Sequence, residues 1–327
     1  MKKFSLQILI IVGLALILDS FIFLCVREKL PMLYYPEPHR FGQLLGALER
    51  NSADIVFLGD SVLTTSADNE DPAGIQDYLQ KDFPELKVYT LNHSGFRPPE
   101  YLELCRFMAS YKHKPKIVII PINLCTFSYS LLGDQPEMQE LRAYLRNDYT
   151  YFVFYRPLLL FKSDIFSRIQ EQDMNNAAFY FYNTKLGTYK DYLDIVKMTD
   201  KKERIIKGLS FQFHYQLDNQ YPFVKDLMEC AKVLKAHDIK PVFLILPSPY
   251  GYVQEYLSQD YMQLVDRNIS FLDSLFQNQG DPFLDLSHSL PKESFLWEYY
   301  PNAHLKHEGR AMVALKLGQY IKNLNVK

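Results

Sequence analysis

The chain has 327 residues, of which 48% are hydrophobic and 23% charged, which excludes a disordered protein and leaves room for a sizeable core in one or two domains. Its formal net charge of -2 at pH 7 excludes the basic surface that nucleic-acid-binding proteins carry. Its 4 cysteines form no CxxC pair and show no metal-ligand spacing, so we expect no metal or other cofactor and at most one disulfide, with buried free thiols favoured.

The first element predicted along the chain is a membrane-spanning helix. Lys2 and Lys3 precede an apolar run over residues 4–26 whose only charged side chain is Asp19. A run of this length matches the ~20 residues that an α-helix needs to cross a bilayer. We therefore predict a signal anchor over residues 1–27, and a buried hairpin helix of a soluble protein is the alternative.

Two kinds of cleaved leader fit this N-terminus less well. A signal peptide has a shorter apolar core and a small-residue cleavage site. A lipoprotein signal has a small residue before its cysteine, whereas here Leu24 precedes Cys25. Arg27 and Lys29 flank the far end of the run and reduce the charge difference that orients such a helix. We predict a single-pass protein of the cytoplasmic membrane, with its N-terminus inside and its C-terminal domain extracytoplasmic.

Residues 28–52 are predicted to form a juxtamembrane linker that precedes one folded domain over residues 53–327. The first part of the linker, LPMLYYPEPHR, is marked by prolines and is expected to be extended. Its second part, FGQLLGALERN, has the apolar spacing of a short amphipathic helix.

The first half of the domain alternates short apolar runs with helical patterns. Each predicted strand is a nearly continuous apolar run, which is typical of strands that helices cover on both faces. Strands and helices that alternate at this spacing predict a three-layer α/β/α fold around a parallel sheet. The strands are predicted over residues 54–59, 87–95 and 115–123, and the helices over 72–83 and 98–112.

Roughly residues 127–220 break this pattern with aromatic-rich stretches such as YTYFVFYRPLLLF. We predict a mostly helical insertion there, which is able to line or cover a site. The α/β pattern then resumes toward the C-terminus. It predicts helices over residues 223–239, 252–278 and 305–324, and strands over 240–249 and 282–287.

Polar residues follow three of the predicted strands, at the ends where parallel sheets bind ligands. Ser61 ends a Gly-Asp-Ser sequence after the first strand, Gly95 lies in the turn after the second, and Asn123 ends the third. His304 lies just before the terminal helix. Each has a structural alternative: an N-cap for Ser61, a backbone turn for Gly95, a loop cap for Asn123, and a capping or surface role for His304.

These residue types suit nucleophilic attack on an ester. A serine hydroxyl becomes a useful nucleophile when a nearby base takes its proton, and histidine titrates in the right range. The attack places negative charge on the carbonyl oxygen, which backbone amides and an asparagine side chain stabilise. Cys125 lies close to Asn123, but no histidine lies nearby in the pattern, so we exclude it as the nucleophile. Asp60 is expected to serve the turn through its hydrogen bonds.

The four residues, in this order and at these places, resemble the SGNH (GDSL) hydrolase superfamily, which is named for Ser, Gly, Asn and His. GDS at residues 59–61 matches its nucleophile block, and Gly95 matches its glycine block. Asn123 matches its asparagine block, and His304, within HLKHEGR, matches its last block.

The resemblance implies a role for each of these residues and implies no cofactor. Ser61 would attack an acyl ester, and His304 would relay the proton. The backbone amides of Ser61 and Gly95, together with the side-chain amide of Asn123, would hold the oxyanion.

The resemblance covers about residues 54–126 and 222–325, with one departure. The family usually has an aspartate three residues before its histidine, where this chain has Pro301. Asn302 stands one position later, where some relatives carry their acid, and Glu298 lies nearby. An asparagine can hold the histidine tautomer but stabilises the imidazolium less than a carboxylate does. A Ser-His dyad, a weakened triad with Asn302 and an inactive site all stay open.

Together with the predicted anchor, the resemblance implies a membrane-tethered serine esterase or O-acyltransferase that acts on an acylated cell-envelope glycan or a similar ester. The chain is similar to membrane-anchored SGNH proteins that add or remove acyl groups on teichoic acid or alginate. Such proteins commonly work beside a multi-spanning membrane acyltransferase, which is the partner that the resemblance implies. The alternative is a catalytically inactive SGNH-fold binding or scaffold protein in envelope polysaccharide assembly.

Overall fold

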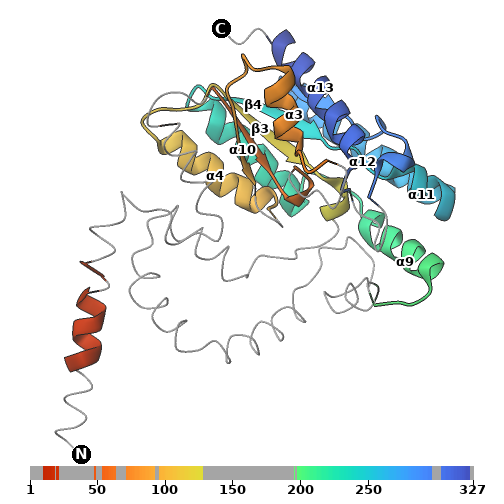
Figure 1. The fold of residues 1–327 in the computed structure, drawn as a ribbon, viewed down its shortest axis with the longest axis horizontal. Coiled ribbons are helices and arrows are strands. Elements are labelled where there is room, and N and C mark those ends of the chain that lie inside the picture. Colours follow the sequence, from red (N-terminus) through yellow and green to blue (C-terminus); the bar gives the residue numbers. More distant parts are fainter. Residues whose placement is uncertain are drawn as a thin grey trace, which may run out of the picture. The chain divides into compact units, whose positions relative to one another are not determined.

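Figure 1 shows the computed structural model of the chain, which divides into two compact units. One unit comprises residues 1–43 and 132–173, and the other comprises residues 44–131 and 174–327. The structure describes residues 10–18, 20–21, 48, 54–63, 71–92, 96–127, 195, 197–296 and 303–324.

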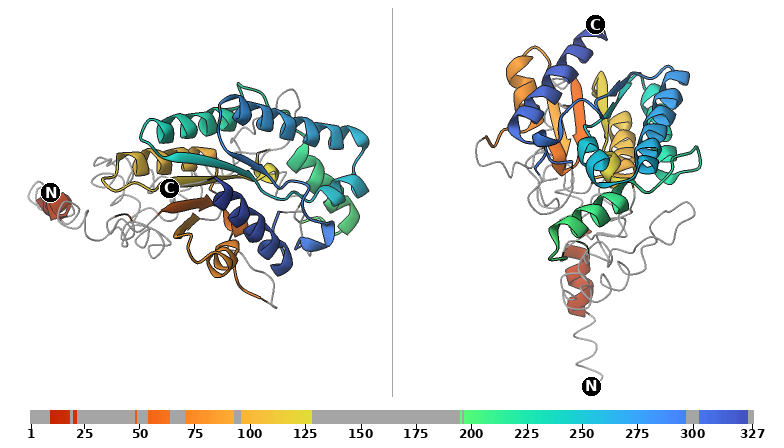
Figure 2. Two further views of the ribbon diagram at one scale, coloured as in Figure 1. Left: turned by 90° about the horizontal axis from the view of Figure 1, so that it is seen from above. Right: turned by 90° about the vertical axis from the view of Figure 1, so that its right-hand side faces the viewer.

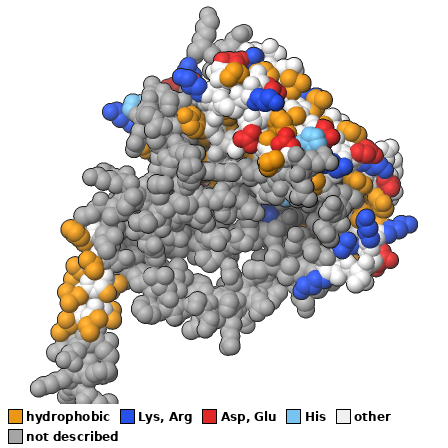
Figure 3. All heavy atoms as spheres, viewed as in Figure 1, with side chains coloured by type: hydrophobic (Ala, Val, Ile, Leu, Met, Phe, Trp, Pro, Cys, Tyr) orange, Lys and Arg blue, Asp and Glu red, His pale blue; other side chains and the backbone are white. Residues whose placement is uncertain are grey.

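In the first unit, residues 10–18 and 20–21 are helical, and most of their large apolar side chains are exposed (Figure 3). The rest of the anchor predicted over residues 1–27 lies outside the described residues. So does the linker predicted over residues 28–52, apart from Leu48, which is helical. No helix among the described residues is long and apolar enough to cross a membrane. The anchor and its orientation stay predictions.

The second unit is built on a five-stranded sheet in which each pair of neighbouring strands is parallel. Its first and third strands are buried along their whole length, as continuous runs of branched apolar residues predict. The predicted strands are thereby confirmed. In the order β2-β1-β3-β4-β5 across the sheet, they are β2 (Val88–Asn92), β1 (Ile55–Gly59), β3 (Ile117–Ile122), β4 (Lys240–Ile245) and β5 (Phe283–Asp285).

The strand order explains why helices cover both faces of the sheet. The chain moves from β1 to β2 in one direction, then passes back beyond β1 to β3, β4 and β5. Because parallel crossovers are right-handed, this reversal sends the helices that connect the later strands to the opposite face. Figure 2 shows α3 (Ile75–Asp82) and α13 (His307–Asn323) on one face. The other face carries α4 (Pro98–Ser110), α10 (Pro222–Lys235) and α12 (Gln259–Asn278). The predicted three-layer α/β/α arrangement is confirmed.

One predicted helix is wrong in extent. The helix expected over residues 252–278 is two helices, α11 (Tyr250–Tyr256) and α12. Leu257 and Ser258 have extended backbones between them, with ψ angles of 168° and 165°. Serine is a favoured residue at the start of a helix, so Ser258 suits the first position before α12.

The aromatic-rich insertion predicted over residues 127–220 is described only at its two ends. Its C-terminal end contains α9 (Lys201–Phe213), which begins after Asp200, whose carboxylate accepts a hydrogen bond from the Glu203 amide at 2.8 Å. Helical structure is therefore confirmed for this part, and the remainder of the insertion lies outside the described residues. The three described cysteines, Cys105, Cys125 and Cys230, are buried free thiols, as predicted.

Candidate active site

The candidate site lies where the strand order reverses, at the carboxyl ends of β1 and β3. Ile55 pairs with Ile117 and Phe57 with Ile119, so the same register continued past both strands brings Ser61 level with Asn123. Ligands in open parallel sheets bind at this kind of reversal, because the loops on its two sides separate there. The fold therefore brings two of the predicted site residues to one place.

The Gly-Asp-Ser sequence forms a tight turn after β1. Ser61 begins a short 3-10 helix, η2 (Ser61–Leu63), and the Asp60 carboxylate accepts a hydrogen bond from the Val62 amide at 2.9 Å. Asp60 thus caps the turn, a role that the structural alternative gave to Ser61. A side chain at Gly59 would place its Cβ 2.0 Å from the Leu63 side chain, so glycine is needed for the close approach.

Ser61 and His304 are in contact although 243 positions separate them along the chain. The distance between Ser61 Oγ and His304 Nε2 is 3.1 Å. The segment that carries the histidine is held by backbone hydrogen bonds, because His304 O accepts from Leu296 N at 2.8 Å and Leu305 forms an antiparallel bridge with Phe295. This geometry is the one that a serine nucleophile and its base require. The two catalytic roles stay predictions.

The surroundings of His304 favour its neutral form. Burial lowers the pKa of His304 because it disfavours the imidazolium, while the negative charge of Asp60 raises it by a smaller amount. A neutral imidazole with its proton on Nδ1 presents Nε2 as an acceptor to the Ser61 hydroxyl. His304 is therefore suited to take the serine proton at neutral pH.

Replacing Asp60 by asparagine is expected to extend ester hydrolysis to lower pH. In the wild type the Asp60 carboxylate raises the pKa of His304, so removing the charge lowers that pKa. The base then stays neutral at lower pH, and the acid limb of kcat/KM against pH moves in the acid direction. The control is Asp260→Asn, at an exposed position in the first turn of α12. An acid limb that stays in place or moves to higher pH contradicts this account.

Asn123 lies at the site, but its side chain makes other contacts than those expected of a group that only donates to an oxyanion. Its Nδ2 donates to Asp60 Oδ2 at 2.9 Å, and its Oδ1 accepts from the Cys125 amide at 3.2 Å. The bond from the Cys125 amide is the loop cap that the structural alternative describes. The bond to Asp60 uses one of the two N–H groups of the amide. The oxyanion role of Asn123, and that of the Ser61 amide, stay predictions.

Two predicted site residues lie outside the described residues, namely Gly95 and Asn302. Pro301 and Glu298 lie outside them as well. The second backbone donor and the residue that orients His304 thus stay predictions.

Sequence reasoning missed three buried side chains that bond to the turn after β3. They are Arg97, Tyr215 and Tyr221. Arg97 comes two positions after the glycine block, which is a weak signal in retrospect. The tyrosines lie in an aromatic-rich part of the chain and carry no local signal.

Neither a metal-ligand group nor a reactive thiol is found at this place among the described residues. Among them, no group of three or more His, Cys, Asp or Glu side chains is arranged to hold a metal ion. Burial raises the pKa of the Cys125 thiol far above its usual range, with a smaller contribution from Asp60. A thiol that stays protonated is a poor nucleophile, which supports the exclusion of Cys125.

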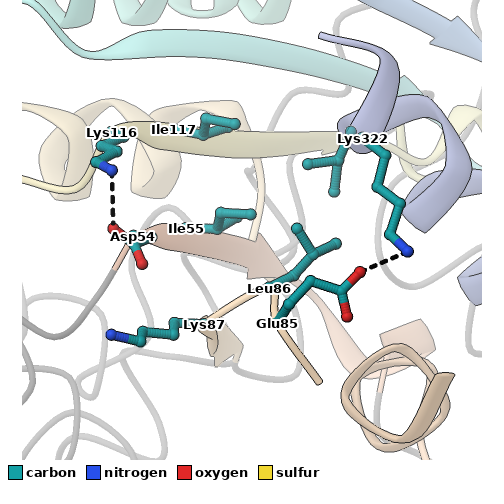
Figure 4. Close-up of a pocket in the computed structure, with 9 residues that line it drawn as sticks. Asp54, Ile55, Glu85, Leu86, Lys87, Lys116, Ile117 and Lys322 are labelled. Carbon is teal, nitrogen blue, oxygen red and sulfur yellow. Dashed lines mark ion pairs between the residues drawn. The ribbon is translucent and has the colours of Figure 1, made fainter. Parts of the chain in front are cut away.

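A pocket among the described residues lies at the amino ends of the strands, opposite to the ends that carry Ser61 and Asn123 (Figure 4). It is lined at the beginnings of β1, β2 and β3 and by the last turns of α13. Four of the lining residues form two ion pairs, Asp54 with Lys116 at 3.4 Å and Glu85 with Lys322 at 2.5 Å. This pocket is separate from the Ser61 site, because Ser61 follows the carboxyl end of β1.

Solved structures with a similar fold have low sequence identity to this chain. One is a GDSL-like lipase from Bacteroides thetaiotaomicron, with 12% identity, a TM-score of 0.40, and coverage of 87% of this chain and 97% of the lipase. Another is a catalytic mutant of an acetylxylan esterase from Geobacillus stearothermophilus, with 14% identity, a TM-score of 0.41, and coverage of 82% and 93%. No family model and no curated protein matches the chain.

The chain resembles the SGNH (GDSL) hydrolases. This resemblance rests on the motif blocks of the sequence, at Ser61, Gly95, Asn123 and His304. The candidate site is defined by its own geometry, namely the contact between Ser61 and His304 at the carboxyl end of β1.

Proposed function

We propose that the protein is a serine esterase or O-acyltransferase of the SGNH type. The observation that carries this proposal is the 3.1 Å contact between Ser61 Oγ and His304 Nε2 at the carboxyl end of β1. A hydroxyl at a strand end and a neutral imidazole within hydrogen-bond distance form the minimal apparatus for acyl transfer through a covalent intermediate.

The reaction then follows from the chemistry of these groups. Ser61 Oγ attacks the acyl carbonyl carbon while His304 Nε2 takes the hydroxyl proton. The bond to the leaving alcohol breaks, and the imidazolium returns its proton to the alcohol oxygen. Water or a second hydroxyl then attacks the acyl-serine, and His304 takes and returns a proton again. The amides of Ser61 and Gly95 and the Asn123 side chain stabilise the oxyanion in both steps.

Asp60 supplies a negative charge close to His304 in a chain that has Pro301 where relatives have an aspartate. Asp60 is 4% exposed, and its carboxylate accepts hydrogen bonds from the Val62 amide and from Asn123 Nδ2. A buried carboxylate near the ring stabilises the imidazolium through space. Burial lowers the pKa of His304 overall, and the charge of Asp60 opposes part of that shift. In this proposal the pair of Ser61 and His304 works with Asp60 as its nearby charge, and Asn302 orients the ring.

The finer proposal is that the enzyme is tethered to the cytoplasmic membrane and acts outside it on an acylated envelope glycan, beside a multi-spanning acyltransferase. It is supported by the apolar run over residues 4–26 and by exposed aliphatic side chains on helical residues 10–18. The tether is tested by fractionating cells that produce the full chain. Recovery in the membrane fraction after a high-salt wash supports it, and recovery in the soluble fraction contradicts it.

Turnover by the full-length protein in detergent tests the proposed function. The substrates are p-nitrophenyl acetate and an O-acetylated polysaccharide, and the products are nitrophenol and acetate. We expect turnover by the wild type and by Ser258→Ala, whose exposed serine precedes α12 without a side-chain cap. An acceptor sugar that raises nitrophenol release and becomes acetylated identifies the transferase. A folded protein without hydrolysis or transfer contradicts the proposal and leaves the binding or scaffold alternative.

A further inference from the structure

The turn that carries Asn123 is held from outside by three buried side chains. We define the Asn123 turn as residues 123–127, which contain the short 3-10 helix η3 (Leu124–Thr126). Within it, the Asn123 carbonyl accepts from Thr126 N at 3.0 Å and from Thr126 Oγ1 at 2.8 Å. The Leu124 carbonyl accepts from Phe127 N at 3.3 Å, and Asn123 Oδ1 accepts from the Cys125 amide at 3.2 Å. A turn this short is a weak support for a residue that must hold its position.

Three carbonyl groups of the Asn123 turn accept hydrogen bonds from distant side chains. The Tyr215 hydroxyl donates to Leu124 O at 2.7 Å, and the Tyr221 hydroxyl donates to Phe127 O. The third donor is Arg97 Nη1, which lies 3.2 Å from Thr126 O. The last carbonyls of a helix usually lack enough partners within the helix, and side chains from elsewhere can supply them.

The three donor side chains are held in place by burial and by further hydrogen bonds. Arg97, Tyr215 and Tyr221 are 4%, 2% and 1% exposed. Burial raises the pKa of Tyr215 and of Tyr221 well above the usual range, so both hydroxyls keep their protons and remain donors. Asn268 of α12 holds the tyrosine segment, because its Nδ2 donates to Tyr215 O at 2.9 Å and its Oδ1 accepts from Leu217 N at 2.8 Å.

We propose that Tyr215 and Tyr221 are positioning residues for the reaction, which hold the Asn123 turn so that the Asn123 amide stays beside Asp60 and Ser61. This inference rests on the proposed function. The ring of Phe127 stacks on both tyrosines, with interplanar angles of 28° and 11°, so the same contacts also fix the end of the turn. A displacement of the amide by about 1 Å is enough to cost on the order of 10²-fold in rate.

The test is a double-mutant cycle between each tyrosine and Asn123. Tyr215→Phe and Tyr221→Phe remove the hydroxyl and keep the ring, and each is expected to lower kcat for p-nitrophenyl acetate about tenfold, the cost of an imperfectly placed donor. KM and the acid limb of the pH profile are expected to stay as in the wild type. In an Asn123→Ala background, which itself loses about 10²- to 10³-fold in kcat, the same changes are expected to have almost no further effect.

The control is Tyr320→Phe, which removes a tyrosine hydroxyl bonded to a carbonyl elsewhere. Tyr320 donates to Phe283 O at 3.1 Å, at the beginning of β5, on the far edge of the sheet from Ser61. We expect its kcat to equal that of the wild type. Equal losses in kcat in the wild-type and Asn123→Ala backgrounds overturn the positioning role, as do unchanged kcat values in an active enzyme.

Amide hydrogen exchange tests the positioning role of the tyrosines independently of the proposed function. A wild type without activity contradicts the proposed function, and the amides of Thr126 and Phe127 then decide the positioning role. Both are bonded within the Asn123 turn, at 3.0 and 3.3 Å. We expect them to exchange faster in Tyr215→Phe and Tyr221→Phe than in the wild type and in Tyr320→Phe. Equal exchange in all four proteins overturns the inference.

Discussion

Replacing Ser61 by alanine is expected to lower kcat/KM for ester hydrolysis by about 10⁴-fold or more, as removal of the nucleophile does in serine hydrolases. The hydroxyl of Ser61 lies 3.1 Å from His304 Nε2, so the change removes the attacking atom. The turn should persist, because Asp60 accepts the Val62 amide and caps it. The measurement is initial rates with p-nitrophenyl acetate, with the thermal unfolding midpoint recorded for each protein.

The matched control for this prediction is Ser258→Ala, which removes an exposed hydroxyl before α12. It is expected to keep the wild-type rate. Less than a tenfold loss in folded Ser61→Ala contradicts a nucleophilic role for Ser61. Another side chain or a bound water would then have to carry the attack.

Replacing His304 by glutamine is expected to lower kcat by about 10⁴-fold while KM changes little, since the base acts on the chemical step. A glutamine side chain can bond to the serine hydroxyl but cannot accept its proton at neutral pH. The acid limb that the pKa of His304 sets in the wild type should disappear, and the residual rate should rise with hydroxide concentration. The measurement is kcat and KM as functions of pH.

Its control is His237→Gln, at an exposed histidine near the end of α10. This variant should keep both kcat and the acid limb. An acid limb that persists in His304→Gln shows that another group titrates, and it contradicts the role of His304 as the base.

The strands were predictable because their signal is local. Continuous apolar runs such as residues 55–58 are typical of strands in a sheet that helices cover on both faces. In the structure these residues are buried. The break between α11 and α12 was not predicted, because the helical periodicity continues through Leu257 and Ser258 while their backbones are extended. Helix ends are decided by caps and packing, which a periodic pattern does not show.

The position of the candidate site could be predicted from the order of the strands, but the contacts between its side chains could not. Ser61 and Asn123 follow neighbouring strands, so the topology alone brings them together. The contact to His304 followed only from the resemblance, since nothing local links positions 243 apart. The bond from Asn123 to Asp60 was not predicted, because a side-chain amide has two N–H groups and the sequence does not say where they point.

The tyrosines of the Asn123 turn were missed for a different reason. They lie 91 and 94 residues from the carbonyls that they bond, Leu124 O and Phe127 O. In a segment rich in aromatic residues, Tyr215 and Tyr221 have the pattern of ordinary core. Only the folded chain shows that their hydroxyls are paired with the backbone that follows the third strand.

The most direct measurement of the central claim is peptide mass spectrometry after reaction with a fluorophosphonate, which bonds covalently to an activated serine hydroxyl. We expect a single adduct on Ser61 in the full-length wild type, with labelling slowed strongly in His304→Gln and at the wild-type rate in His237→Gln. Folded protein without an adduct, an adduct on a different residue, or equal labelling with and without His304 would contradict it.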